Sequence, residues 1–520
     1  MTTLSLATVL AESARRTPDK LALIEGQVRL TYAELWADAR RYGAALAARG
    51  LGPGSRVALV APNVADFVRA YYGILATGGV VVPVPTLLNA EEAAYIIGHS
   101  GAQAVMYESG FAGVATGAAQ AVGVPAWEVE DFAGDAEPMR TSETTQAEDP
   151  AVIFYTSGTT GRPKGAVLTH LNLVMNATAN AFDANPFLRT DIVMGCLPLF
   201  HTFGQSVSMN STFRVGATLL LQPRFEARQA IEIMRREGAT LFFGVPTMFV
   251  QLLKAASGLD GAEDLPELRD CISGGASLPA AVLEKFEKAF GTTIFEGYGL
   301  SETSPTATVN QPWFGTKAGT VGHPIWGVEV EIADETIEHR IELLPVGRLG
   351  EIVIRGHNIF TGYLDDPEAT EQAIVDGWFR TGDIGLKDDE GFISIVDRKK
   401  DLIIRGGFNV YPREVEEVLM RHPAVAQVAV IGVPDEERGE EVCAVVIPVR
   451  PGALDGPELG QWARERLGRH KYPRRIEVVE ALPMGPSHKV LKRELRRQFA
   501  QVESTQVEST QLQGGVRSWT

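Results

Sequence analysis

Apolar residues in the first 330 positions follow two alternating spacings. Short apolar runs such as 56–60 are bounded by polar residues and are typical of buried strands. Amphipathic segments such as 65–76 lie between these runs and are typical of helices. Thr31 and Glu34 form a capping-box pattern that opens a further helix, which ends near Gly50. Strands and helices that alternate at this spacing predict a layered α/β fold.

The pattern changes twice toward the C-terminus. After residue 330 the segments 351–354 and 392–395 predict a β-rich region. After Asp397 a short α/β segment begins, with a helix predicted over 412–421. We therefore expect domains at 1–396 and 397–498. The remainder, 499–520, repeats Gln-Val-Glu-Ser-Thr without apolar periodicity and is predicted to be disordered.

Length and charge narrow the function classes. A chain of 520 residues is too long for one core, so at least two domains are expected. The formal net charge of −17 argues against a nucleic-acid-binding protein. Eleven of the residues between Arg464 and Arg497 are lysine or arginine, which indicates a solvated helical face or a surface that steers anionic substrates.

Cysteine usage and the N-terminus predict a cytoplasmic protein. Cys196, Cys271 and Cys443 are too far apart in sequence to indicate a disulfide framework or a metal cluster. The first thirty residues lack the pattern of a signal peptide. The longest uncharged run, 71–90, approaches the length of a membrane span but contains three glycines and two prolines. We interpret it as a helix end, a turn and a buried strand, and peripheral membrane contact stays open.

The segment from Tyr155 to Gly165, Tyr-Thr-Ser-Gly-Thr-Thr-Gly-Arg-Pro-Lys-Gly, follows a predicted strand at 151–154. Its glycines let backbone N–H groups approach phosphate oxygens, its hydroxyls add donors, and Lys164 adds a positive charge. An ordinary Ser/Thr/Gly-rich turn rarely needs so many donors. The glycine spacing excludes the common nucleoside-triphosphate loop, in which Gly-Lys-Ser/Thr follows. The segment predicts a different kind of phosphate loop.

This segment resembles the phosphate loop of the adenylate-forming enzymes, which include acyl-CoA synthetases, luciferases and peptide-synthetase adenylation domains. Six further segments resemble that family's motifs in the same order, within a resemblance that spans about residues 10–498: 198–204, 273–277, 297–303, 378–383, 397–409 and 483–489. The resemblance implies an α/β fold in which a large N-terminal domain of layered α/β subdomains and a β-rich subdomain is hinged to a small mobile α/β C-terminal domain.

The resemblance also implies roles for individual residues. Lys489, Glu302 and His201 would be catalytic, Glu302 would hold Mg²⁺, and Asp397 would be the hinge. The residues implied to bind ATP or coenzyme A are Thr156, Ser157, Gly158, Thr159, Thr160, Lys164, Gly275, Ala276, Ser277, Gly297, Tyr298, Gly299, Thr303, Asp383, Arg398, Lys400, Gly406 and Gly407. The family's usual glycine before the lysine is replaced by His488.

The expected reaction is ATP-dependent ligation of a carboxylic acid to coenzyme A through an acyl-adenylate, with release of AMP and pyrophosphate. The apolar segment 242–249, with Cys196 and Met209, is predicted to line the acid pocket and favours a medium- or long-chain fatty acid. The alternatives are an aryl-acid CoA ligase and a fatty acyl-AMP ligase that loads a carrier protein. A luciferase-like monooxygenase and a non-catalytic ATP-binding protein are further competing hypotheses. The protein is expected to be a monomer or homodimer.

Overall fold

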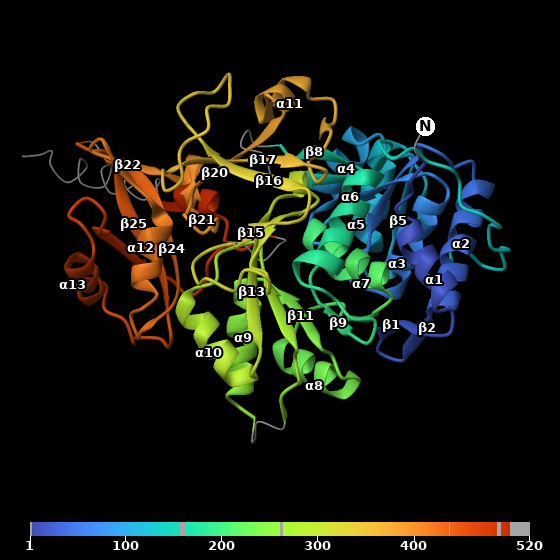
Figure 1. The fold of residues 1–520 in the computed structure, drawn as a ribbon, viewed down its shortest axis with the longest axis horizontal. Coiled ribbons are helices and arrows are strands. Elements are labelled where there is room, and N and C mark those ends of the chain that lie inside the picture. The colour runs from blue at the N-terminus through green and yellow to red at the C-terminus, as the bar shows by residue number, and fades with distance from the viewer. Residues whose placement is uncertain (1–2, 157–161, 260–263, 436, 486–489, 500–520) are drawn as a thin grey trace, which may run out of the picture. The chain divides into compact units, whose positions relative to one another are not determined.

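A computed structural model describes residues 3–156, 162–259, 264–435, 437–485 and 490–499 (Figure 1). The chain forms two compact units. Unit 1 comprises Met1–Arg348, Ile352–Thr381 and Lys387–Ser394, and unit 2 comprises Leu349–Glu351, Gly382–Leu386 and Ile395–Thr520. Each unit has its own hydrophobic core.

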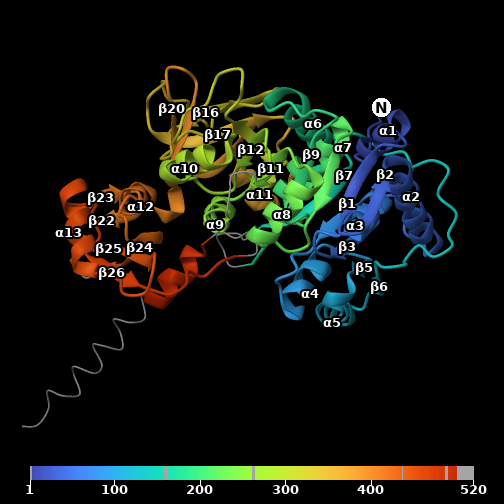
Figure 2. The ribbon, with the colours of Figure 1, turned by 90° about the horizontal axis from the view of Figure 1, so that it is seen from below.

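The first sheet of unit 1 is mainly parallel and has the strand order β18-β8-β7-β4-β3-β5-β6. Its strands are β3 (Arg56–Val60), β4 (Val80–Pro83), β5 (Ala104–Tyr107), β6 (Ala126–Glu128), β7 (Pro150–Thr156), β8 (Lys164–Thr169) and β18 (Gly362–Tyr363). The helices interleaved with them are α2 (Tyr32–Ala48), α3 (Ala65–Ala76), α4 (Ala90–His99) and α5 (Ala112–Val122). Helices α4 and α5 lie side by side near β5 and β6 (Figure 2). Strands β4 and β5 are buried along their whole length, as parallel strands covered by helices require.

The second sheet of unit 1 has the order β15-β14-β13-β12-β11-β9-β10-β1-β2. Its strands are β1 (Leu21–Glu25), β2 (Val28–Thr31), β9 (Ile192–Gly195), β10 (Thr218–Leu221), β11 (Leu241–Gly244), β12 (Asp270–Ser273), β13 (Thr293–Gly299), β14 (Thr306–Val309) and β15 (His323–Pro324). The accompanying helices are α1 (Thr8–Arg16), α6 (His170–Ala179), α7 (Ser211–Val215), α8 (Ala227–Glu237), α9 (Pro246–Ala256) and α10 (Ala280–Phe290). Because β11, β12 and β13 are parallel, their carboxyl ends meet at one edge of the sheet.

A smaller sheet contains β16, β17, β20 and β19 in that order, with β21 paired to β20. The bounds are β16 (Val328–Ala333), β17 (Gly350–Gly356), β19 (Ile374–Val375), β20 (Trp378–Lys387) and β21 (Ile393–Arg398), and the short helix α11 (Pro367–Ala373) precedes β19. The β-rich region predicted after residue 330 is therefore confirmed.

Unit 2 carries a sheet with the order β23-β22-β25-β24, and β26 pairs with β25. Its elements are β22 (Ile403–Arg405), β23 (Phe408–Val410), α12 (Pro412–Leu419), β24 (Val425–Asp435), β25 (Gly439–Pro448), α13 (Gly456–Arg466) and β26 (Arg475–Val478). Residues 492–499 are helical. Its α/β character, predicted from the sequence after Asp397, is confirmed.

Several local predictions are also confirmed. Thr31 caps α2 with a full capping box, in which its side chain accepts the N–H of Glu34. The uncharged run 71–90 contains the end of α3 and all of β4, and it is buried up to Val84. Among the described helices, none has both the length and the apolar character of a membrane span. The predicted disordered tail lies outside the described residues from residue 500 onward.

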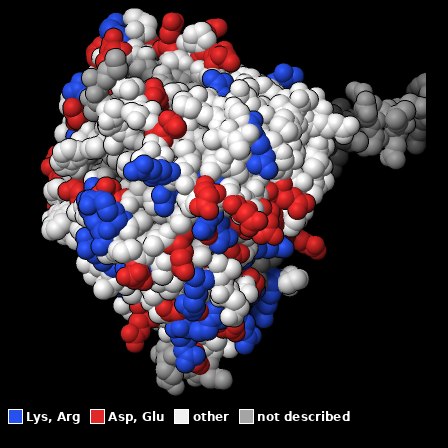
Figure 3. Space-filling view, turned by 90° about the vertical axis from the view of Figure 1, so that its right-hand side faces the viewer, with Lys and Arg blue, Asp and Glu red and all other residues white. Residues whose placement is uncertain are grey.

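The described surface carries charges of both signs, and the three cysteines, all among the described residues, form no disulfide, as their sequence spacing predicted. On the face shown in Figure 3, lysine and arginine side chains are interspersed with aspartate and glutamate, and a broad area carries no charge. The three cysteines are buried free thiols. Burial raises the pKa of the Cys196 thiol to about 12, which makes it a poor nucleophile at neutral pH.

Candidate active site

Strands β7 and β8 hold the two flanks of the predicted phosphate loop side by side. The strands are antiparallel, and Thr156 at the end of β7 pairs with Lys164 at the start of β8. The chain therefore leaves and re-enters the sheet at one place. Four residues predicted to bind phosphate lie outside the described residues: Ser157, Gly158, Thr159 and Thr160.

Lys164, the cation of this loop, contacts two residues near α11. Its Nζ lies 3.3 Å from Oδ2 of Asp366 and 5.2 Å from the centre of the Tyr363 ring. The Asp366 carboxylate also accepts the backbone N–H of Ala369 at 3.0 Å and so caps α11. This N–H, and to a lesser extent Lys164, holds the pKa of Asp366 below its usual value.

Glu302, the predicted magnesium ligand, lies on the same side of the sheet. Its Oε1 accepts a hydrogen bond from the Tyr363 hydroxyl at 2.9 Å and a longer one from Thr156 Oγ1 at 3.5 Å. Glu302, which is far in sequence from the loop, thus contacts Thr156 directly and is linked to Lys164 through Tyr363. One carboxylate at this place suits Mg²⁺, which takes its other ligands from phosphate oxygens and water. Among the described residues there is no cluster of three or more potential metal ligands.

Tyr363 is a residue that the sequence analysis missed. Strand β18, which contains it, pairs with β8, so Tyr363 stands opposite Ala166 just beyond the loop. Burial, followed by the negative charge of Glu302, raises the pKa of the Tyr363 hydroxyl, which therefore stays protonated and can donate. A lone Tyr after a Gly carries no recognisable signal, so only the pairing of distant strands could reveal it.

Side chains of helix α4 contact the residues that flank the phosphate loop. His99 Nδ1 lies 2.8 Å from the Tyr155 hydroxyl, and the Tyr95 hydroxyl donates to the carbonyl oxygen of Pro163 at 3.1 Å. The Arg162 guanidinium lies over the Tyr95 ring, 5.6 Å from its centre. Both flanks of the loop are therefore attached to one helix, although neither Tyr95 nor His99 belongs to a recognised motif.

Two predicted nucleotide-binding segments meet at the carboxyl ends of β12 and β13. Gly275, Ala276 and Ser277 follow β12, whereas Gly297, Tyr298 and Gly299 end β13. The two strands are parallel neighbours, with Ser273 opposite Glu296. Gly275 and Ala276 are exposed, and Ser277 and Tyr298 are partly exposed. The arrangement presents backbone and one aromatic ring at a single sheet edge.

Position 299 accommodates only glycine, because the backbone of Pro305 lies against it. A Cβ atom on Gly299 would lie 1.7 Å from the carbonyl oxygen of Pro305, so no side chain fits. Thr303 is fully buried, and its hydroxyl accepts the N–H of Leu300 at 2.8 Å and donates to the carbonyl of Pro305. A hydroxyl engaged in this way is a poor candidate for a phosphate contact. The neighbouring Ser301 is partly exposed, and its Oγ lies 3.5 Å from Thr202 Oγ1.

His201 precedes the π-helical segment η3 (Phe203–Asn210). The backbone N–H of His201 donates to the carbonyl oxygen of Pro198 at 3.1 Å, and the His201 carbonyl oxygen accepts the backbone N–H of Gln205 at 2.9 Å. The ring is partly exposed, with its centre 6.0 Å from that of Phe200. The backbone of this turn is tight, because a Cβ atom on Gly204 would lie 2.3 Å from the Pro198 carbonyl oxygen. The turn thus fixes the histidine backbone.

The residues predicted to line the acid pocket are packed in cores. Phe249 makes an edge contact with Phe286 at 4.9 Å, and Phe243 packs on Phe187 at 5.4 Å. Met209 belongs to the core that contains Phe213. Neighbouring side chains bury them, so their apolar character is explained by core packing. It therefore does not indicate which class of acid the enzyme uses.

In unit 2 two of the residues implied to bind ATP or coenzyme A, Asp383 and Arg398, lie together. Arg398 Nε is 3.1 Å from Oδ1 of Asp383, and the Asp383 side chain is buried. The predicted hinge residue Asp397 is buried as well, and its carboxylate accepts the backbone N–H groups of Arg398 at 2.7 Å and Arg413 at 2.9 Å. Burial raises the pKa of Asp397 despite these bonds.

Three further residues implied to bind ATP or coenzyme A, Lys400, Gly406 and Gly407, lie in or shortly before the hairpin of β22 and β23. Gly406 and Gly407, at φ of +56° and +82°, make the two-residue turn between β22 and β23. Desolvation of the Lys400 ammonium, followed by the positive charge of Arg398, lowers the pKa of Lys400. Lys489 and the preceding His488 lie outside the described residues.

The comparisons with known proteins agree with this arrangement. Residues 10–364 match the model of the AMP-binding enzyme family, and residues 414–489 match that of the AMP-binding enzyme C-terminal domain. The chain belongs to the AMP-binding enzymes. Two similar proteins are a long-chain-fatty-acid–CoA ligase of Bacillus subtilis and a feruloyl-CoA synthase of Amycolatopsis sp. The first is 34% identical, with 94% of each chain covered, and the second is 36% identical, with 94% of this chain and 97% of the other covered.

A solved structure shares the fold of this AMP-binding enzyme. The ATP-bound crystal structure of MatB from Rhodopseudomonas palustris has a TM-score of 0.88 and 32% sequence identity, and the alignment covers 95% of this chain and 99% of that one. The layered α/β fold with a separate C-terminal part, predicted from the sequence, is therefore confirmed. The coarser functional prediction, an adenylate-forming CoA ligase that uses ATP, is also confirmed.

Proposed function

We propose that this AMP-binding enzyme converts a medium- or long-chain fatty acid to its CoA thioester through an acyl-adenylate, with release of AMP and pyrophosphate. The observation that carries the ATP-dependent part is the cluster of Thr156, Lys164 and Glu302 around Tyr363. A cation, a carboxylate and hydroxyls at the end of a glycine-rich hairpin are what a metal–triphosphate complex needs.

Adenylate formation has to overcome charge repulsion. A carboxylate attacks the α-phosphorus of ATP, a new acyl–phosphate bond forms, and pyrophosphate leaves. Lys164 offsets the negative charge of the phosphates, and Glu302 holds Mg²⁺, which when bound neutralises phosphate oxygens. The hydroxyls near Glu302 that remain for phosphate are those of Thr156 and Ser301, because the Thr303 hydroxyl is engaged by backbone groups. Lys489 is expected from the family resemblance to orient the two reactants.

Thioester formation is assigned to the residues of unit 2. The CoA thiol attacks the acyl carbon and AMP leaves. We propose that 1–396 and 397–498 are separate domains, that Asp397 is the hinge between them, and that the Lys400–Gly407 segment serves the thiol step. The glycine hairpin supports this role, because its positive φ angles allow a tight turn that brings no side chain of its own.

The fatty acid is supported by the Bacillus relative, and the aryl alternative by the Amycolatopsis relative, which is slightly more identical. Both therefore enter the test. Pyrophosphate release and CoA thioester formation would be measured with octanoate, palmitate, benzoate and ferulate, with and without CoA. The variants are Lys489→Ala and, as a matched control, Arg493→Ala, an exposed residue of the same segment.

We expect thioester formation with the fatty acids, lost in Lys489→Ala and kept in Arg493→Ala. Turnover with ferulate or benzoate only would replace the fatty acid by an aryl acid. Pyrophosphate without any thioester would point to an enzyme that loads a carrier protein. No pyrophosphate with any acid would overturn the proposal.

A further inference from the structure

Lys164 and Asp366 form an ion pair at the very place where phosphate is expected. Lys164 is the cation of the loop, and its Nζ lies 3.3 Å from Oδ2 of Asp366. Both side chains reach solvent, with exposed fractions of 23% for Lys164 and 37% for Asp366. An ion pair that water and ligands can reach is weak and can be exchanged for another partner.

Asp366 is held in place independently of Lys164. It is the N-cap of α11, where its Oδ1 accepts the N–H of Ala369 at 3.0 Å. Its own carbonyl accepts the Thr370 hydroxyl at 2.9 Å, and that hydroxyl in turn accepts the N–H of Tyr363 at 2.9 Å. The second oxygen of Asp366, Oδ2, is the one that faces Lys164. The position of the negative charge is thus fixed by the helix cap and does not depend on the lysine.

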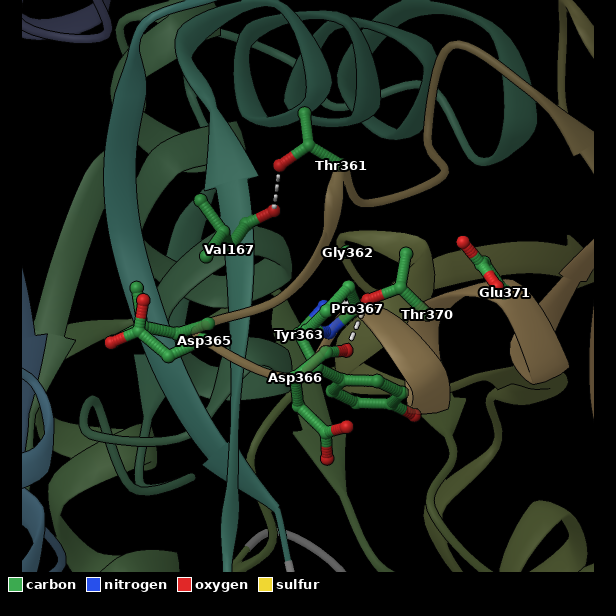
Figure 4. Close-up of a pocket in the computed structure, with 10 residues that line it drawn as sticks. Val167, Thr361, Gly362, Tyr363, Asp365, Asp366, Pro367, Thr370 and Glu371 are labelled. Carbon is green, nitrogen blue, oxygen red and sulfur yellow. Dashed lines mark hydrogen bonds between the residues drawn. The ribbon is translucent and has the colours of Figure 1, made fainter.

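A shallow hollow adjoins this pair. It is lined by residues 361–367 with Val167, Thr370 and Glu371, so it contains Tyr363, Asp365 and Asp366 (Figure 4). Three of its residues, Asp365, Asp366 and Glu371, carry negative charge. An anionic nucleotide that approaches Lys164 therefore meets a fixed carboxylate next to the cation it needs.

We propose that Asp366 is the resting partner of Lys164 and competes with the phosphates of ATP for it, so that this residue sets the affinity for nucleotide. The inference rests on the proposed function in one respect, which is that Lys164 binds phosphate. When ATP binds, the lysine exchanges the carboxylate for phosphate oxygens, and the repulsion between Asp366 and the phosphates remains as a cost. When the nucleotide products leave, Asp366 takes the lysine back.

The helix cap offers a clean substitution. Asp366→Asn removes the charge but keeps an oxygen that can accept the Ala369 N–H, since Asn is as good an N-cap as Asp. Asp365→Asn is the matched control, because Asp365 is an exposed neighbour at φ of +53°, a conformation that Asn tolerates. Lys164→Met tests the premise. All are made in the full-length protein.

Binding of ATP and of inorganic tripolyphosphate would be measured by titration calorimetry without acid and without metal. For both ligands we expect Asp366→Asn to lower the Kd about two- to five-fold, the range that exposed charge pairs give, and Asp365→Asn to change it less. The gain should shrink at 0.5 M salt, because salt screens exposed charges.

An unchanged or raised Kd in Asp366→Asn would overturn the inference, provided that Lys164→Met binds tripolyphosphate more weakly than the wild type. If Lys164→Met binds it as tightly as the wild type, the proposed role of Lys164 fails instead. Thermal unfolding of Asp366→Asn, compared with Asp366→Ala, shows whether the cap of α11 was kept. If Asp365→Asn lowers the Kd as much as Asp366→Asn does, the effect comes from the total negative charge near the site. That result would also contradict a specific role for the Lys164–Asp366 pair.

Discussion

Lys164 in unit 1 and Lys492 in unit 2 each pair with a carboxylate, but their surroundings differ. The ammonium of Lys164 pairs with the Asp366 carboxylate at 3.3 Å, and the Asp366 side chain is 37% exposed. Lys492 lies 2.7 Å from Glu416 and is also stabilised by the charge of the buried Asp397. The two lysines are similarly exposed, at 23% and 19%, but Lys164 faces a more exposed carboxylate, whereas Lys492 lies near two carboxylates, Glu416 at 21% exposure and the buried Asp397.

The backbone explains why the second pair is fixed. Glu416 Oε1, the oxygen that pairs with Lys492, also accepts the N–H of Val430 at 2.8 Å. Both oxygens of Asp397 accept backbone N–H groups, from Arg398 and Arg413. A ligand that displaced Lys492 would leave these carboxylates facing each other without compensation. A lysine thus serves binding where its one carboxylate is more exposed, and architecture where its carboxylates are also bonded to backbone N–H groups.

The largest expected effect follows from Lys492→Met. Removing the ammonium leaves Glu416 and Asp397 as uncompensated neighbours, so the free energy of unfolding should fall by about 2–3 kcal/mol, somewhat less than for a fully buried pair. Hydrogen exchange of the Val430 amide, followed by mass spectrometry, would show where the structure opens. Arg493→Met, at an exposed position of the same helix, is the control. Equal stability of the two variants would contradict an architectural role for Lys492.

The next largest effect is the pH dependence of stability, which has opposite signs for His170 in unit 1 and Asp397 in unit 2. Burial lowers the pKa of His170 in unit 1 to about 4, and its Nδ1 accepts the N–H of Leu6 at 3.0 Å. Between pH 6.5 and 4 the unfolded chain binds the proton and the folded chain does not, so stability is lost as the pH falls through this window. At pH 5 the expected loss is about 2 kcal/mol.

His170→Asn isolates this contribution, since an Asn oxygen can accept the same N–H. Denaturant unfolding at pH 7 and pH 5 should show a smaller pH-dependent loss in this variant than in the wild type. In unit 2 the raised pKa of Asp397 acts in the opposite direction, because protonation relieves a buried charge as the pH falls. The same pH dependence in His170→Asn as in the wild type would refute the assignment.

The smallest effect on stability is expected for Lys164→Met. An exposed pair contributes little, so the free energy of unfolding should change by about 0.5 kcal/mol or less. The same variant should bind ATP at least about ten-fold more weakly, because a charge contact to phosphate is lost. Denaturant unfolding and calorimetry on one preparation would measure both. A stability loss as large as that of Lys492→Met would remove the contrast between the two lysines.

Much of the fold could be predicted because its signals are local. The capping box of Thr31, the apolar strand 56–60 and the helix 65–76 each depend on neighbouring residues, and the structure confirms them. The acid pocket stays a prediction, and it shows the limit of local reasoning. Phe249 and Met209 are apolar in the way that a pocket residue would be, but their partners come from distant segments and enclose them. Apolar character alone cannot distinguish a core from a cavity.

The order of the elements and the motifs that carry phosphate chemistry can be read from the chain alone, because glycine spacing, hydroxyls and charges lie in consecutive residues. Which of these groups meet depends on contacts between distant segments. Tyr363 joins Glu302 to the Lys164 region because β18 pairs with β8 across nearly two hundred residues. Tertiary packing also turns the Thr303 hydroxyl toward backbone groups and places the Asp366 carboxylate beside Lys164. Long-range strand pairing and packing set these contacts, and no local pattern encodes them.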